Sequence, residues 1–236
     1  MSLKTMRDRW VFRGSYTPGA SAGVDPWLKK DTSSAGSPTM TTTADGLKTT
    51  LAATNEIEVM TLYFGDVLSY DIDDIIRAEF VLKANTTLAA NETLVVGLAS
   101  AQADDPDTIA ANTWFKIVGA ASANTTLLCE SDDGTTDNDD KATGISLGTS
   151  AHKRLIIDFS TEVQTRSPPF ASKGKQAAFF VADATNLLRR VADNVEFDMS
   201  GYSSGLQPFL QLQKASGTGV PAVSLLEFCI DYRLPA

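Results

Sequence analysis

The sequence predicts an all-β protein built as an antiparallel β-sandwich. Short runs rich in β-branched and aromatic residues recur along the chain, and several of them alternate apolar and polar residues. Turn-forming residues separate the runs, in place of crossover helices. The chain has 236 residues and 43% hydrophobic content, which suits one sizeable core in a single sandwich domain.

The runs expected to be strands follow residue 45 and share a β-forming composition. They are residues 57–64, 77–84, 93–100, 113–120, 125–130, 153–160, 176–183, 206–214 and 224–234. Period-two alternation is clearest in two of these runs. The side chains expected to face the core there are Leu155, Ile157, Phe159, Leu226, Phe228, Ile230 and Tyr232. Only residues 104–112 look helical, with Asp105 as the cap and Pro106 in the first turn.

Residues 1–45 differ in composition from the rest of the chain. They are rich in Gly, Ser, Thr and Pro and lack the periodic apolar face that a folded core requires. Trp10, Phe12 and Trp27 stand out as apolar anchors within this polar tract. We therefore expect an extended N-terminal arm over residues 1–45 and a β-sandwich domain over residues 46–236.

Residues 129–144 form an acidic tract that carries a single lysine. Its carboxylates are Glu130, Asp132, Asp133, Asp137, Asp139 and Asp140. A calcium loop of the EF-hand type needs a glycine at its turn and a closing glutamate, and no register of the tract supplies both. The tract is also rich in turn formers. We therefore expect a solvated hairpin between two strands, with an irregular calcium site as the less favoured alternative.

The sequence predicts no catalytic site. A retaining glycosidase needs two carboxyl groups about 5 Å apart, and jelly-roll hydrolases place them on one strand as Glu-x-Asp-x-Glu or Glu-x-Asp-x-x-Glu. The nearest match has Glu196 and Asp198, but Ser200 and Gly201 hold the positions of the third carboxylate. His152 is the single histidine, and no serine elbow accompanies it. We expect no enzyme, no cofactor and no metal centre.

Charge and cysteine content restrict the classes of partner. The net charge is −9 and the isoelectric point is near 4.6, which disfavours nucleic acid and anionic membrane surfaces. No run approaches the roughly 20 apolar residues of a membrane span, and no secretory signal is visible. Cys129 and Cys229 are far apart in sequence, so one disulfide is arithmetically possible, although free buried thiols are the commoner outcome.

Several segments together resemble virion structural proteins of tailed bacteriophages. These segments are residues 62–74, 130–144, 154–160, 206–219 and 226–234. The resemblance covers about four-fifths of the chain, from about Leu47 onward. It implies a concanavalin A-like jelly-roll sandwich and a role as a capsid decoration (cement) protein, without catalytic residues.

The resemblance also implies where the protein acts and what it binds. After synthesis in the host cytoplasm it would sit on the capsid surface of the virion, bound to the major capsid protein and to neighbouring copies of itself. Trp10, Phe12 and Trp27 would then be the partner contacts, because buried aromatic anchors strengthen interfaces most. The alternative is a carbohydrate-binding or host-receptor-binding virion module, in which Trp114 or Tyr202 would form the sugar platform.

Overall fold

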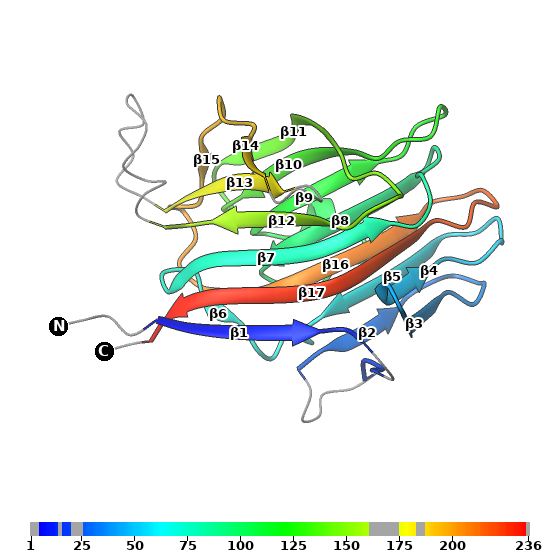
Figure 1. Ribbon diagram of the computed structural model, residues 1–236, viewed down its shortest axis with the longest axis horizontal. Helices are drawn as coiled ribbons and strands as arrows, with labels where there is room; N and C mark the ends of the chain where they lie inside the picture. The colour runs from blue at the N-terminus through cyan, green and yellow to red at the C-terminus, as the bar shows by residue number, and fades with distance from the viewer. Residues whose placement is uncertain (1–4, 14–15, 20–25, 161–174, 183–186, 235–236) are drawn as a thin grey trace.

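The computed structural model describes residues 5–13, 16–19, 26–160, 175–182 and 187–234. Within them the chain forms two β-sheets that pack face to face (Figure 1). The named strands pair only in antiparallel fashion. The prediction of an all-β antiparallel sandwich is confirmed. No helix in these ranges is long and apolar enough to cross a membrane.

The first sheet has nine strands, in the order β14-β13-β12-β7-β17-β4-β3, with β1 paired to β17 and β15 paired to β13. Its strands are β1 (Thr5–Val11), β3 (Thr39–Thr43), β4 (Gly46–Thr50), β7 (Ile75–Ala84), β12 (Lys153–Asp158), β13 (Gln176–Ala182), β14 (Leu188–Val191), β15 (Phe197–Asp198) and β17 (Ala222–Arg233). The long strand β17 therefore has β7 on one side and both β1 and β4 on the other.

The second sheet has eight strands, in the order β11-β10-β9-β8-β16-β5-β2, with β6 paired to β16. Its strands are β2 (Leu28–Asp31), β5 (Glu58–Tyr63), β6 (Tyr70–Asp71), β8 (Glu92–Ala99), β9 (Asn112–Val118), β10 (Thr126–Asp132), β11 (Asp137–Ser146) and β16 (Gly205–Lys214). Every run expected to be a strand from its composition overlaps one of these strands or one of the first sheet, with ends that differ by one or two residues in most cases.

The hydrophobic core lies between the two sheets. Leu155, Ile157 and Phe159 belong to it, as the alternation of their run predicts. In β17 the prediction fails at one position, because Leu225 is in the core and Leu226 is only half-buried. The register of β17 against β7 shifts between Leu225 and Glu227. This β-bulge adds one residue to the strand and turns Leu226 away from the core.

The N-terminal segment is not an arm outside the sandwich, and the expected boundary at residue 45 is wrong. β1 pairs with β17 over its full length, β2 pairs with β5, and β3 forms a hairpin with β4 (Figure 1). Such strands need little apolar periodicity of their own, since the unpaired edge of an existing sheet offers a row of backbone donors and acceptors.

The aromatic residues of this segment complete the core of the same chain. Phe12 and Trp27 are each only 1% exposed. The indole of Trp27 meets Phe64 and Phe228 edge to face, with ring centroids 4.7 and 5.5 Å apart, and Trp10 stacks on Phe228 at 5.5 Å. This corrects the expectation that Trp10, Phe12 and Trp27 are partner contacts: Phe12 and Trp27 are buried within the chain, and half-buried Trp10 uses part of its surface to pack against the same core.

Two further expectations change in detail. The segment predicted to be helical forms a single 3₁₀ turn, Pro106–Thr108, and Asp105 caps it by accepting a hydrogen bond from the amide of Asp107 at 3.2 Å. The acidic tract is a hairpin between two strands, but only Asp133–Thr136 is its turn, because β11 begins at Asp137. Of the six carboxylates of the tract, only Asp133 therefore lies in the turn, and the other five lie on β10 or β11.

Candidate functional site

The outer face of the second sheet is partly covered by the segment of residues 100–111, which joins β8 to β9. The carbonyl of Ala103 accepts a hydrogen bond from Gln211 of β16 at 2.8 Å, and Asp104 accepts one from Thr32 at 2.8 Å. Ile109 of the segment packs against Trp114 in a small second core that is separate from the main one. We call residues 100–111 the cover segment.

A row of residues across the sheet explains why the cover segment lies here. Trp114, Gly97, Phe209 and Tyr63 are register partners on β9, β8, β16 and β5. Gly97 is needed in this row, since a Cβ there would lie 2.5 Å from Cα of Trp114. The missing side chain lets Trp114 and Phe209 stack across the glycine, with ring centroids 6.0 Å apart. The cover segment buries this apolar row, and Trp114 is 0% exposed.

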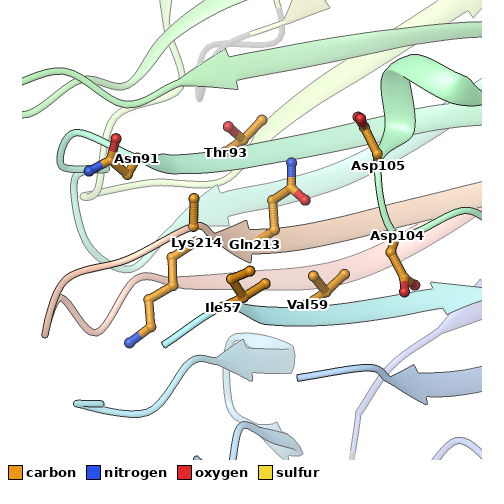
Figure 2. Close-up of a pocket in the computed structure, with 9 residues that line it drawn as sticks. Ile57, Val59, Asn91, Thr93, Asp104, Asp105, Gln213 and Lys214 are labelled. Atoms are coloured by element: carbon orange, nitrogen blue, oxygen red, sulfur yellow. The ribbon is translucent and has the colours of Figure 1, made fainter. Parts of the chain in front are cut away.

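Two pockets flank the cover segment on this face. The larger has a volume of about 470 Å³ and is mostly apolar, with Ile57, Val59 and Gln213 on one side and Asp104 on the other (Figure 2). Figure 2 shows the side chain of Lys214 extending away from the other lining residues. Its charge therefore contributes little to this pocket.

The smaller pocket, of about 270 Å³, lies over β9, β10 and β11 and is mainly polar. We call it the carboxylate pocket, after the six carboxylates that line it: Asp107, Glu130, Asp132, Asp137, Asp139 and Asp140. Lys116 is its single cation among the lining residues, and its Nζ lies 3.1 Å from both Asp107 and Glu130 and 3.5 Å from Asp140. The formal charge of the lining is therefore five negative charges in excess.

Burial and like charges control protonation in this pocket. Burial raises the pKa of Glu130 to about 7, although the neighbouring Lys116 ammonium works in the opposite direction. Burial alone would lower the pKa of Lys116, but the carboxylates of Glu130 and Asp107 raise it above its usual value. Burial, together with the charges of Asp139 and Asp132, also raises the pKa of Asp137. The pocket therefore holds more negative charge than its own cation balances.

The two aromatic residues considered for sugar binding are not exposed platforms. Trp114 lies under the cover segment, and its indole nitrogen is buried without a hydrogen-bond partner among the described residues. Tyr202 is half-buried, packs against the main core and donates its hydroxyl to the carbonyl of Gly205 at 3.0 Å.

The residues considered for catalysis have structural contacts. Glu196 accepts a hydrogen bond from Gln176, and Asp198 accepts one from the amide of Ser200 at 3.0 Å. His152 Nε2 lies 2.9 Å from the carbonyl of Asp45. Within the described ranges no group of three or more His, Cys, Asp and Glu side chains is placed to hold a metal ion.

The two cysteines are both buried and unpaired. Cys129 belongs to the main core between the sheets, whereas Cys229 lies on the outer side of β17, where its thiol donates to Glu227 at 3.2 Å. The disulfide left open by the sequence does not form.

Sequence reasoning treated the acidic tract as solvated and missed its buried part. Glu130 is 2% exposed and Lys116 is 7% exposed. Asn112, on the strand before the tract, was missed as well. The sequence did contain one signal for this site. Asn112, Trp114 and Lys116 are spaced two residues apart, so on a strand their side chains lie on the same face.

Comparisons with known proteins show the fold of this chain. No family model and no curated protein matches it. Among solved structures, a protein of unknown function from Shewanella oneidensis is 7% identical with a TM-score of 0.57, over 99% of this chain and 88% of that one. Peanut lectin is 10% identical with a TM-score of 0.56, over 99% and 100% of the two chains. The Crh5 transglycosylase is 12% identical with a TM-score of 0.52, over 98% and 85%.

At these identities the comparisons speak for the fold alone. The predicted concanavalin A-like jelly-roll sandwich is confirmed. The neighbours include a lectin and an enzyme, so the shared fold does not select between binding and catalysis.

Proposed function

We propose that this protein is a structural, non-catalytic component of a tailed-bacteriophage virion that binds the outer surface of the assembled capsid. The sequence resemblance to decoration proteins is the starting point, and the confirmed sandwich fold agrees with it. In this role the protein stabilises the shell by mass action, since it binds the assembled form only. Its partners are the major capsid protein and neighbouring copies of itself.

The observation that carries this proposal is the cover segment. A groove for catalysis or for sugar stacking needs an open face with exposed aromatic or convergent catalytic groups. Here the chain's own residues 100–111 bury Trp114 and Phe209 in the middle of that face. A surface whose central aromatic row is covered by its own chain supports a structural role over a groove that processes a polymer.

Attachment needs side chains other than Phe12 and Trp27, which are buried in the core. Val67 and Leu68, which follow β5, are 67% and 53% exposed and adjacent in sequence. Exposed apolar pairs of this kind supply the central contacts of many interfaces. We therefore assign Val67 and Leu68 to the capsid-facing surface.

Density-gradient purification of virions from the source culture tests the proposal. The chain is expected to co-band with the major capsid protein in a fixed ratio, and to remain with capsids after tails are removed. A chain found only in the soluble fraction would refute the virion role. In binding to purified capsids, the variant Val67→Ser/Leu68→Ser should be weaker, while Val220→Ser, at an apolar residue that is 44% exposed, serves as the matched control.

A second candidate function is carbohydrate binding. Peanut lectin shares the fold, and the carboxylate pocket offers the hydrogen-bond acceptors that sugar hydroxyls require. A glycan array with the purified chain separates the two candidates. Saturable binding to a defined glycan, lost in Asp132→Asn, would favour this second function.

A further inference from the structure

The carboxylate pocket contains a row of acceptors that crosses three strands. Asn112 of β9 is the register partner of Asp132 of β10, and Asp132 is the partner of Asp137 of β11. Neighbouring strands are about 4.8 Å apart, so the row extends over roughly 10 Å of the sheet. All three residues line the pocket. A ligand on this row meets oxygens from three strands at once.

The side-chain oxygen of Asn112 is an acceptor in this row that has no donor facing it in the described part of the chain. Asn112 is only 2% exposed, and its buried Oδ1 has no hydrogen-bond partner among the described residues. A buried acceptor without a partner costs about 1–3 kcal/mol, so native structures rarely leave one unsatisfied. Asn112 lines the pocket, so its side-chain amide lies beside the space that a donor group would enter.

Lys116 does not supply the missing donor. An ammonium group has three donors, and Nζ of Lys116 already contacts Asp107, Glu130 and Asp140. Asp132 Oδ1 accepts from the amide of Gly134 at 2.7 Å, which is a local turn contact that leaves its charge unbalanced. The end of the pocket at Asn112, Asp132 and Asp137 therefore combines negative charge with unused acceptors.

A cation with several donors would suit this end of the pocket. In the described ranges no group of three or more His, Cys, Asp and Glu side chains is placed to hold a metal ion, so an organic cation is the better candidate. A neutral sugar would supply donors but leave the excess negative charge in place. A guanidinium group carries a positive charge and five donors in a planar fork, which suits oxygens spread along a row better than the point charge of an ammonium does.

We propose that the row Asn112–Asp132–Asp137 in the carboxylate pocket binds the side chain of an arginine presented by a protein partner. The guanidinium bridges the carboxylates of Asp132 and Asp137 and donates to Oδ1 of Asn112. Its charge also relieves the repulsion that raises the pKa of Asp137. The inference is independent of the capsid, because the purified chain alone tests it.

Titration of the ¹⁵N-labelled chain with N-acetyl-argininamide at pH 7 and low salt is the test. The side-chain amide signals of Asn112 should shift saturably, with a dissociation constant on the order of 1 mM. The substitution Asp132→Asn keeps the turn contact to Gly134 but removes the charge, and it should weaken binding about tenfold or more. Asp31→Asn is the matched control, because exposed Asp31 makes the same type of turn contact, to the amide of Ser33, on β2 at the opposite edge of the sheet.

Ligand controls test the proposed chemistry. N-acetyl-lysinamide should bind at least threefold more weakly than the arginine probe, and methyl glucoside should cause no shift at Asn112. The proposal is overturned if the arginine probe gives no saturable shift, or if Asp132→Asn binds it as the wild type does. Tighter binding of Ca²⁺ or of the neutral sugar at the same signals would also overturn it, in favour of a metal or a glycan site.

Discussion

Replacing Trp27 by alanine tests whether the N-terminal segment belongs to the fold. Trp27 precedes β2 and is 1% exposed. Its indole has four aromatic neighbours within 6.0 Å of ring centroid distance: Trp10, Phe12, Phe64 and Phe228. These neighbours come from widely separated parts of the sequence. The side chain therefore joins β1 and the described residues around β2 to the main core.

The expected magnitude follows from this burial. Removing a buried tryptophan side chain costs about 3–5 kcal/mol, including the cavity that remains. For 236 residues, an unfolding entropy of about 2.1 cal/mol/K per residue amounts to about 0.5 kcal/mol/K. The Tm of Trp27→Ala should therefore lie about 6–10 °C below that of the wild type.

Thermal and urea unfolding, followed by circular dichroism, measure this change. Val67→Ala is the control, because Val67 is 67% exposed and its truncation should change the free energy of unfolding by less than about 0.5 kcal/mol. A Tm for Trp27→Ala within about 1 °C of the wild type would refute the placement of Trp27 in the core. That result would restore the view of residues 1–45 as an arm that folds only against a partner.

Three further predictions concern single residues. The raised pKa of Glu130, about 7 against an ordinary 4.5, means that the folded state keeps a proton that the unfolded chain releases. The free energy of unfolding of the wild type in urea should therefore fall as pH rises from about 4.5 to 7, and Glu130→Gln should lack this part of the fall. The same pH dependence in both proteins would contradict the prediction. Gly97→Ala places a Cβ 2.5 Å from Cα of Trp114, so it should lower the free energy of unfolding in urea by about 1–3 kcal/mol or more. An unchanged midpoint of urea unfolding would contradict the close packing of the aromatic row. Burial raises the pKa of both Cys129 and Cys229, the latter to about 12. A thiol reagent should therefore label these two cysteines only after the protein unfolds. Fast labelling of the native protein would contradict this, because it would show that a thiol is accessible.

The strands that the sequence predicted well are those whose evidence is local. Leu155, Ile157 and Phe159 alternate with other residues along one short run, and that pattern alone predicts which side chains face the core. Leu226 shows the limit of such reasoning. The β-bulge beside it depends on the pairing of β17 with β7, and pairing is not visible in either strand by itself.

The candidate site was predictable only in part, for the same reason. The acidic tract and its turn were recognisable from composition. The burial of Glu130 beside Lys116 was not, because it depends on which strand lies next to β10 and on the contribution of Asp107 from the cover segment. Asn112 carried no signal as a single residue, and its role appears only through its register with Asp132.

The sequence by itself determined the fold class, the acidic charge and the absence of a complete glycosidase motif around Glu196, since each follows from residue type and short-range spacing. Tertiary structure decided that residues 5–11 and 28–31 are sheet strands, that the cover segment buries the aromatic row of one face, and that Asn112, Asp132 and Asp137 form one row. The physical reason is that a β-strand satisfies its backbone through hydrogen bonds to partners distant in sequence. Local pattern predicts that a strand exists, and only the folded chain selects its neighbour.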